Sequence, residues 1–597
     1  MFRKFKAKQI EREDLATYIF SCLFFLLVLK LFQMQIIKYR YYHQLSEKNR
    51  IRVLVVEPPR GIIYDRNLMP IVTNTPSFAV SILPFEFKPS EAILKGLKEV
   101  LGMRMDELLA RLEMLERTRY EPVKIRRNVP FEIVAKLEEN NLDYQGVICE
   151  AEPQRVYQYG STAAHIVGYL GEVSVDDLQS PMDEYLRPGE LVGKQGVERV
   201  FDRILRGQLG AKFLEVRATG EVIGQARERK NIEPVKGADI VLTIDIELQK
   251  FVEQFMEPIP RGVAIVMDPT NGEILALVSR PAFDPSLFAT GISDSLWKRL
   301  NDPQLHPLFN RAVQGYYPPG SIMKIITAAA CLDRGLVTPE THLEPCRGSI
   351  WYGDRYFKCW FPGGHGDINL LDAIATSCDV YFYQLGLKLG LNAWSDYAKK
   401  SGFGTPTGIE LKPEGAGFVP DRSYFSAKYG QYGWGYGVVL NLAIGQGEIL
   451  VTPIQVAQFF SALANGGTIY RPHILKAIVP PFGRARQIKP EIVGHLPFSA
   501  EAIKACIKGM SRVVNSRWGT GIEAHLDNIE VAGKTSTVQN PHGAPHGWFV
   551  SFAPANDPKL LVVLLAENWG SGSSIAYIAR EIFDYYFFKR GQNLSRR

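Results

Sequence analysis

The sequence has no block of lysine or arginine, no low-complexity tract and no repeat of fixed period. Its formal net charge is only +6 over 597 residues, so the charge pattern does not require a nucleic-acid partner. A composition that is 46% hydrophobic and 22% charged is typical of folded globular proteins and argues against long disordered stretches. A chain of this length exceeds one hydrophobic core, so several domains are expected.

Cysteine is scarce and odd in number. Seven cysteines cannot all pair, which argues against a complete disulfide framework. Three of them, Cys346, Cys359 and Cys378, nevertheless lie close together in the sequence. This cluster therefore needs an explanation of its own.

The longest apolar run lies near the N-terminus. Residues 15–37 are almost all apolar and, as a helix, would cross a hydrocarbon layer about 30 Å thick. A cleaved signal peptide is the alternative, but the length of the run and the lack of a small-x-small site after it favour a retained anchor. Lys30, the one charge within the run, either snorkels to the interface or faces a membrane partner.

Basic residues on either side of the apolar run bear on its orientation. Those before it favour an N-terminus inside the cell, although Lys38 and Arg40 after it weaken that bias. The basic residues before the run are Arg3, Lys4, Lys6, Lys8 and Arg12. We therefore expect the large C-terminal part outside the cytoplasm.

The rest of the chain divides near Lys236, between Pro234 and Gly237. Before this point we expect strands at 51–56, within 60–67 and at 212–223, a helix over 91–115, and an amphipathic helix within 193–207. After it, we expect a strand running into a helix at 240–255, a hairpin at 262–279, and apolar strands at 546–554 and 559–568. The apolar strands imply a central sheet.

Residues 316–335 carry the first candidate site. A Pro-Pro-Gly stop precedes a helix of small and apolar residues, with Ser321 at its start and Lys324 one turn on. A neutral amine at that spacing can take the serine proton, and the helix N-terminus favours a developing oxyanion. Ser295 and Lys298 repeat the spacing among charged residues, which is typical of a solvated helical turn.

Two further motifs follow in order. Ser377-Cys378-Asp379 taken alone is typical of a surface turn or helix cap, and Lys534-Thr535-Ser536-Thr537 lies where a short strand is expected. The ordered set resembles the SxxK, SxN and KTG motifs of penicillin-binding proteins and serine β-lactamases. Segments 60–67, 193–207 and 444–467 resemble those of class B penicillin-binding proteins, so the resemblance covers nearly the whole chain.

The resemblance implies an architecture. It predicts a cytoplasmic tail at 1–14, a transmembrane helix at 15–37, a β-rich α+β pedestal or dimerisation-like domain at 38–236, and an α/β transpeptidase domain at 237–597 with a central antiparallel sheet flanked by helices. No region resembles a glycosyltransferase, which argues against class A. Asp379 in place of Asn resembles the elongation-specific group, similar to penicillin-binding protein 2.

The resemblance also implies a reaction that needs no cofactor. Ser321 would attack the penultimate D-Ala carbonyl of a stem pentapeptide and hold the peptide as an ester until a neighbouring amine attacks. Lys324 would be the general base, with a pKa lowered by burial and by Lys534. Ser377 would relay a proton. β-Lactams, as mimics of D-Ala-D-Ala, would acylate Ser321, and a carboxypeptidase side activity is possible in principle.

The remaining motif residues, Lys534, Thr535, Ser536 and Thr537, are expected to hold the substrate. Lys534, Thr535 and Thr537 would bind its carboxylate, and the backbone N–H groups of Ser321 and Thr537 would form the oxyanion hole.

Two residues depart from the motifs of the family. An ionised Asp379 donates no hydrogen bond, so an amide donor's role must be altered or filled by another group. Ser536 replaces the Gly of KTG and is expected to add a side chain where the strand faces the substrate.

The resemblance implies a place and partners as well. These are a single-pass position in the inner membrane with a periplasmic bulk, a SEDS-family glycan polymerase, and other components of the elongation complex. Ser536 motivates one alternative, a catalytically weak β-lactam-binding scaffold or sensor. A second alternative, a β-lactamase, is disfavoured by the anchor and the long N-terminal part.

The cysteine cluster predicts a structural Zn²⁺ site. Cys346, Cys359, His365 and Cys378 supply three thiolates and an imidazole, and the Gly- and aromatic-rich loop between them has little core of its own. Some elongation-type relatives hold zinc through Asp, His and Cys in this region, which supports the prediction. A Cys346–Cys359 disulfide and buried free cysteines remain the alternatives.

Overall fold

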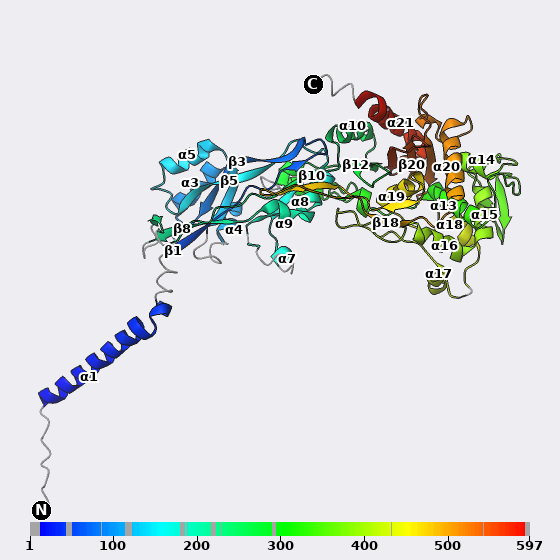
Figure 1. Ribbon diagram of the computed structural model, residues 1–597. Coiled ribbons are helices and arrows are strands. Elements are labelled where there is room, and N and C mark those ends of the chain that lie inside the picture. The colour runs from blue at the N-terminus through cyan, green and yellow to red at the C-terminus, as the bar shows by residue number, and fades with distance from the viewer. Residues whose placement is uncertain are drawn as a thin grey trace, which may run out of the picture. The chain divides into compact units, whose positions relative to one another are not determined.

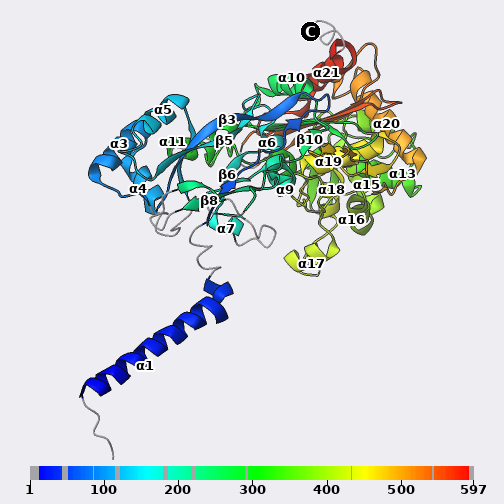
Figure 2. The ribbon, with the colours of Figure 1, turned by 60° about the vertical axis from the view of Figure 1, so that its left-hand side comes forward.

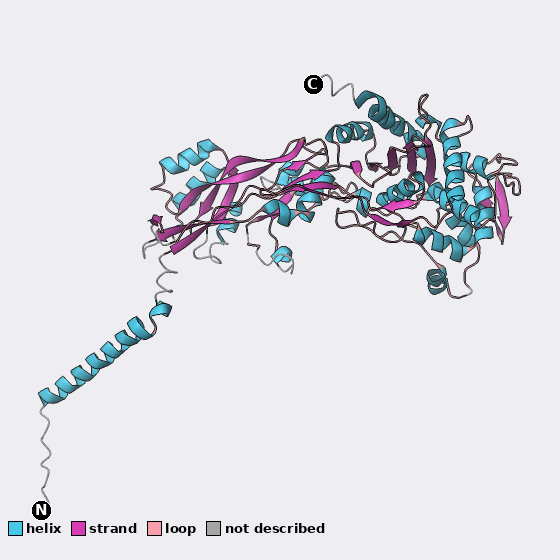
Figure 3. Ribbon diagram, viewed as in Figure 1, coloured by secondary structure: helices cyan, strands magenta, loops and turns pink. Residues whose placement is uncertain are grey.

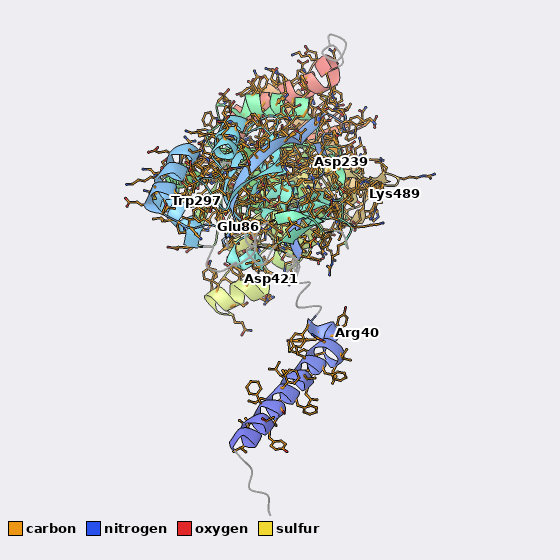
Figure 4. The ribbon with its side chains drawn as sticks, turned by 90° about the vertical axis from the view of Figure 1, so that its left-hand side faces the viewer. Arg40, Glu86, Asp239, Trp297, Asp421 and Lys489 are labelled. Atoms are coloured by element: carbon orange, nitrogen blue, oxygen red, sulfur yellow. The ribbon has the colours of Figure 1, made fainter. Side chains whose placement is uncertain are left out.

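The computed structural model describes residues 12–42, 51–84, 86–113, 122–178, 186–187, 189–216, 222–226, 229–288, 294–431, 433–540 and 543–590. The apolar run is helical as predicted: α1 (Arg12–Phe32) continues into a π-helical turn, η1 (Gln33–Ile37). Within the described residues, Leu15–Ile37 is the one segment long and apolar enough to cross a membrane. Arg40, labelled in Figure 4, follows it. Residues 1–11 of the expected tail lie outside the described residues.

The chain forms two compact units that alternate along the sequence. Unit 1 comprises Met1–Pro58, Ala79–Glu150 and Gln208–Val235, and unit 2 comprises Pro59–Phe78, Ala151–Gly207 and Lys236–Arg597. One boundary falls at Lys236, where the sequence suggested it. Two earlier segments also belong to unit 2, because the long strands β3 (Pro70–Ile82) and β5 (Val147–Tyr157) each pass from one unit into the other.

Unit 1 contains a three-stranded antiparallel sheet in the order β1-β8-β9 and several short helices. Its elements are β1 (Ile51–Val56), α3 (Glu91–Leu101), α4 (Met105–Glu113), β4 (Val123–Val129), α5 (Phe131–Glu139), β8 (Gly210–Val216) and β9 (Val222–Gln225). The single helix expected over 91–115 is two helices, because Gly102 leaves the first one in the left-handed conformation at φ +60°. Residues 114–115 lie outside the described residues.

The first segments of unit 2 surround a buried ion cluster. Arg60 donates to Glu198 and Asp202 at 2.9 and 2.8 Å, and Arg155 donates to Glu198 at 2.6 Å. The amphipathic helix expected within 193–207 is two short helices that end at Gly207, as predicted. The elements are β2 (Ile63–Tyr64), α6 (Ala164–Val167), β6 (Leu170–Glu172), α7 (Val175–Leu178), β7 (Leu191–Gly193), α8 (Gly196–Val200) and α9 (Asp202–Arg206).

A five-stranded antiparallel sheet in the order β12-β11-β21-β20-β19 lies at the centre of the rest of unit 2. The strands are β11 (Gly262–Met267), β12 (Ile274–Arg280), β19 (Ala532–Val538), β20 (His546–Ala553) and β21 (Leu560–Ala566). The predicted hairpin and the two predicted C-terminal strands are confirmed. Helices lie on both sides of the sheet, as Figure 3 shows, which confirms the predicted architecture.

The remaining elements are helices and further strands, of which β10, β16 and β17 belong to a separate sheet in the order β17-β16-β10-β2-β3-β4. The helices are α10 (Ile246–Met256), η3 (Pro285–Phe288), α11 (Asp294–Leu300), α12 (Arg311–Gln314), η4 (Gly320–Met323), α13 (Lys324–Asp333), α14 (Leu370–Ala375), α15 (Asp379–Leu389), α16 (Leu391–Lys400), α17 (Arg422–Tyr429, capped by Asp421 in Figure 4), α18 (Gly437–Ala443), α19 (Pro453–Ala464), α20 (Ala500–Asn515), η5 (Ile522–Ala524), η6 (Gly572–Ile575), α21 (Ala576–Asp584) and η7 (Tyr585–Lys589). The strands are β10 (Asp239–Leu242), β13 (Ser349–Tyr352), β14 (Arg355–Lys358), β15 (Thr468–Tyr470), β16 (Leu475–Val479), β17 (Arg486–Gln487) and β18 (Ile492–His495).

The three sequence motifs meet around α13. In Figures 1 and 2, α13, α15 and α20 lie near one another, and contacts join α13 to both of the other helices. Helix α20 also contacts β19, which carries the last motif. Segments more than 200 residues apart in the sequence therefore converge on one side of the sheet.

Candidate active site

The turn before Ser321 is held by one hydrogen bond at each of three successive residues. Trp548 Nε1 donates to the Pro318 carbonyl at 3.2 Å, and Ser536 Oγ donates to the Pro319 carbonyl at 2.9 Å. Gly320 N donates to the Gly445 carbonyl at 2.8 Å. Ser321 itself lies in η4, half-buried, at the start of the helical run that α13 continues. Its backbone is thus fixed from the sheet side.

Lys324, at the first position of α13, has a fully buried side chain. Its Nζ donates to the Ser377 carbonyl at 2.7 Å, to Ser377 Oγ at 3.2 Å, and to Asp379 Oδ1 at 2.7 Å. A buried ammonium is tolerated only when it is paired and hydrogen-bonded in this way. The structure therefore brings together the lysine of the first motif with both outer residues of the second.

Lys534 reaches the same serine from β19. Its Nζ donates to Ser377 Oγ at 2.9 Å and to the Thr535 carbonyl at 2.9 Å. Burial, together with the charge of Lys324, lowers the pKa of Lys534 well below its ordinary value. The Ser377 hydroxyl therefore lies within hydrogen-bonding distance of both motif lysines, and Lys534 is the one whose environment disfavours the charged form.

The second motif has an unusual backbone. Ser377 lies between α14 and α15 with φ +55°, a conformation that a residue other than glycine adopts only when its surroundings hold it there. The following Cys378 is fully buried, and Asp379 begins α15. Asp379 accepts from the Trp360 backbone N–H at 2.8 Å as well as from Lys324. A carboxylate suits this position because both of its hydrogen-bond partners are donors.

Strand β19 forms one edge of the central sheet, with β20 on its other side. Among its residues, Thr537 is exposed and Thr535 is buried, with Thr535 Oγ1 lying 2.5 Å from Thr520 Oγ1. Gly572 N donates to Thr537 Oγ1 at 3.3 Å. An edge strand keeps backbone groups free to pair with an extended ligand.

The position of Ser536 corrects the expectation from the sequence. Its side chain is 2% exposed, and its hydroxyl donates to Pro319, so it does not add bulk on a substrate-facing side of the strand. A Cβ added to Gly320 would lie 2.3 Å from Ser536 Oγ, which shows how closely the two residues pack. Strand residues two apart share a face, and Lys534 on that face points inward. Ser536 therefore supports the Ser321 turn from within, and a contact of this residue with the substrate stays a prediction.

The four predicted metal ligands form a cluster beside this site. One ligand atom from each of Cys346, Cys359, His365 and Cys378 lies within 4.8 Å of all the others. His365 Nδ1 is 3.8 Å from Cys346 Sγ and 3.5 Å from Cys359 Sγ. Ligand atoms around tetrahedral Zn²⁺ lie about 3.3–3.8 Å apart, so the donor set fits with a closure of at most about 1 Å. All three cysteines are free thiols.

The thiols of this cluster titrate together. Hydrogen bonding to Cys378 lowers the pKa of Cys346 to about 6 and lowers the pKa of Cys359 still more, whereas the same contacts raise the pKa of Cys378. Burial opposes a charge on His365, but hydrogen bonds to Cys359 and Cys346 raise its pKa. The cluster therefore concentrates thiolate character in a small, partly buried volume.

The other serine-lysine pair lies elsewhere. Ser295 and Lys298 belong to the seven-residue helix α11, as the sequence predicted, and not to the cluster around Ser377. Sequence reasoning missed two residues that contact the site, Trp360 and Thr520. For Thr520, its position between Gly519 and Gly521 is a weak signal that could have drawn attention to it.

Comparisons with known proteins agree with this geometry. The penicillin-binding protein transpeptidase domain model matches residues 262–584, and the penicillin-binding protein dimerisation domain model matches residues 55–242. The chain is 34% identical to the peptidoglycan D,D-transpeptidase MrdA of Haemophilus influenzae, over 94% of this chain and 89% of the relative.

Solved structures give the same result. A complex of penicillin-binding protein PBP2 and MreC from Helicobacter pylori matches with a TM-score of 0.77 and 28% identity, over 90% of this chain and 99% of the other. A chain from a study of polymerisation and crosslinking by a peptidoglycan synthase complex matches with a TM-score of 0.68 and 28% identity, over 97% and 99% of the two chains.

Proposed function

The chain belongs to the class B penicillin-binding proteins of the PBP2 group, which are serine-type peptidoglycan D,D-transpeptidases, and we propose that Ser321 is its acyl-forming nucleophile. The observation that supports this most concerns Lys324, which lies one helical turn after Ser321. It converges there with Ser377, Asp379 and Lys534. Ser295 and Lys298 lie in a separate helix, α11.

The acylation step uses the two lysines and Ser377 as one proton network. Lys324 enters the step as a neutral amine, the form that a general base requires. Ser321 Oγ then attacks the penultimate D-Ala carbonyl and gives its proton to Lys324. As the peptide C–N bond breaks, the leaving D-Ala amine takes a proton from Ser377, which is reprotonated by a lysine.

Transfer to the second stem peptide reverses these steps. The amine of a neighbouring stem attacks the ester carbonyl and loses a proton to Lys324, and Ser321 Oγ leaves with a proton. Water in place of the amine would give the carboxypeptidase side reaction. Backbone N–H groups of Ser321 and Thr537 stabilise the oxyanion, while Lys534, Thr535 and Thr537 bind the terminal carboxylate.

A fluorescent penicillin tests this assignment in the full-length protein. Ser321→Ala should abolish covalent labelling and leave the unfolding midpoint unchanged, because the hydroxyl is needed only for bond formation. Ser295→Ala is the matched control and should label like the unchanged protein. Labelling that survives Ser321→Ala would refute the assignment, and an unlabelled but folded parent protein would favour the scaffold alternative.

Zinc in the cysteine cluster is a second part of the proposal. Cys346, Cys359, His365 and Cys378 would hold one structural Zn²⁺, which would fix the loop over 346–365. The support is the donor set and its spacing. Since Cys378 lies between Ser377 and Asp379, the metal would hold the second motif in place.

Metal analysis of the purified protein tests the zinc site. We expect about one equivalent of zinc, lost in His365→Ala together with a lower unfolding midpoint. His342→Ala is the control, because His342 is solvent-exposed and pairs with Asp367. Zinc well below one equivalent, or a Cys346–Cys359 disulfide in a peptide map, would contradict the site.

The anchor helix fits a single-pass membrane protein. We propose a place in the inner membrane with the two units in the periplasm, and assembly with an MreC-like protein and a SEDS-family polymerase in the elongation complex. The supporting observations are the relatives' complexes named above. Replacing residues 15–37 by an unrelated apolar helix should keep penicillin labelling but reduce co-purification of the polymerase. Unchanged co-purification would contradict a contact through the anchor.

A further inference from the structure

The hairpin of β13 and β14 has two different faces. Ile350 and Phe357 pair across it and face inward, where the Phe357 ring lies 5.5 Å from that of Tyr383 on α15. Trp351 and Tyr356 pair on the opposite face, with ring centroids 4.7 Å apart and planes at 70°. The inner pair anchors the hairpin to unit 2, and the outer pair takes no part in that packing.

The outer pair is largely open to solvent. Trp351 is 55% exposed and Tyr356 is 64% exposed, although side chains of this size usually bury much of their surface. Ser349 and Lys358 pair on the same face, since residues two apart in a strand point to the same side. Paired exposed rings with a polar border are typical of a binding surface.

The hairpin is tethered to the active site. Lys358 ends β14, and two residues later the Trp360 N–H donates to Asp379 Oδ2, whose other oxygen accepts from Lys324. Trp360 is four residue steps from Tyr356, a distance of at most about 14 Å when the chain is extended. The aromatic pair therefore lies within about one short peptide length of Trp360, which contacts Asp379 in the polar network around Lys324.

The stem peptide of the substrate has about the same extended length as the segment from Tyr356 to Trp360. In a stem pentapeptide the scissile carbonyl belongs to the fourth residue, so at most about 14 Å of chain separates it from the sugar that carries the stem. Whichever way the stem lies, its sugar must be within that distance of Ser321. An aromatic surface at this range can contact the sugar while the peptide occupies the active site.

We propose that Trp351 and Tyr356 form a subsite for the N-acetyl sugar rings of the glycan strand, an inference that rests on the proposed function. The C–H face of a pyranose ring is apolar and slightly positive, and it packs on the negative face of an aromatic ring. Lys358, on the same side, can meet the carboxylate of a stem peptide.

The surroundings of the pair argue against other occupants. Asp354 in the turn and Lys358 on the same face are exposed, and Arg355 is exposed on the other face, where its guanidinium lies over the Phe357 ring. So many charges within one hairpin do not suit insertion into a lipid layer. The pair forms a ridge on a hairpin, whereas a partner helix is usually received in an apolar groove.

The test compares sugar binding with penicillin acylation in the full-length protein. The probe is a soluble oligomer of N-acetylglucosamine, and the variant is Trp351→Ala/Tyr356→Ala. We expect sugar affinity to fall about tenfold, as loss of two ring contacts implies. Penicillin carries no glycan, so its acylation reports the Ser321 site separately. Any change in acylation should be much smaller than the loss of sugar affinity.

Matched variants distinguish the outcomes. Trp297→Ala, at a 50% exposed tryptophan of α11 labelled in Figure 4, should leave sugar affinity unchanged, and Trp351→Phe/Tyr356→Phe should retain most of it. If the double alanine variant does not fold, Trp351→Ala alone gives the answer. Unchanged sugar affinity in a folded alanine variant, or loss of binding to phospholipid vesicles in place of sugar, would overturn the subsite. A parent protein that binds sugar but is not acylated would instead refute the proposed function.

Discussion

Replacing Ser536 by glycine is expected to weaken the protein and slow its acylation. The Ser536 hydroxyl donates to the Pro319 carbonyl two residues before Ser321, and the side chain is buried. Losing one such hydrogen bond costs about 0.5–1.5 kcal/mol, and glycine within a strand costs about 0.5–1 kcal/mol relative to alanine. We therefore expect Ser536→Gly to lower the free energy of unfolding by about 1–2.5 kcal/mol.

The effect on rate follows from the same contact. If about 1 kcal/mol of positioning is lost in the transition state, acylation by penicillin slows about fivefold. Denaturant unfolding gives the stability, and stopped-flow labelling with a fluorescent penicillin gives the rate.

Two variants separate the hydroxyl from the backbone. Ser536→Ala removes the hydrogen bond alone, so it should give the smaller loss of stability. Ser551→Ala is the matched control, because Ser551 is buried in the neighbouring β20 and its hydroxyl has no hydrogen-bond partner in the described structure. It should change stability by less than about 0.5 kcal/mol. Faster acylation of Ser536→Gly would refute the supporting role and favour the expectation from the sequence, a side chain placed where the strand faces the substrate.

Two other changes test the polar network. Asp379→Asn removes the charge that pairs with Lys324 but keeps an acceptor for the Trp360 N–H, so the free energy of unfolding should fall by about 1.5–3 kcal/mol. The control Asp367→Asn, at an exposed pair, should lower it by less than about 0.5 kcal/mol. Equal effects of the two variants would contradict a buried ion pair. Because the pKa of Lys534 is lowered on folding, the unfolded state binds more protons, and stability should rise with pH from the folded pKa toward the ordinary value of 10.5. Denaturant unfolding between pH 6 and 9 should show a smaller rise in Lys534→Met, and an unchanged slope would mean that Lys534 is protonated in the folded protein.

Much of the fold could be predicted from local patterns. The apolar anchor, the hairpin at 262–279 and the Ser321 helix each depend on residues that are neighbours in the sequence, and all three are present. The helices over 91–115 and 193–207 were predicted as single elements, because periodicity alone does not show that Gly102 ends the first helix or that the backbone of Phe201 leaves the helical conformation.

The site was predicted less completely, because its contacts join distant segments. The direction of Ser536 depends on which face of β19 meets the Ser321 turn, and the sequence does not contain that packing. The donation from Trp360 to Asp379 uses a backbone group, which no residue type reveals. The neutral tendency of Lys534 likewise depends on burial beside Lys324.

The most direct test of the central claim is mass spectrometry of the penicillin-treated full-length protein, with peptide mapping of the adduct. The account predicts one penicilloyl group per chain, located on the peptide that contains Ser321, and none in Ser321→Ala. An adduct on Ser295 or Ser377, or an unmodified parent protein that is folded, would contradict it.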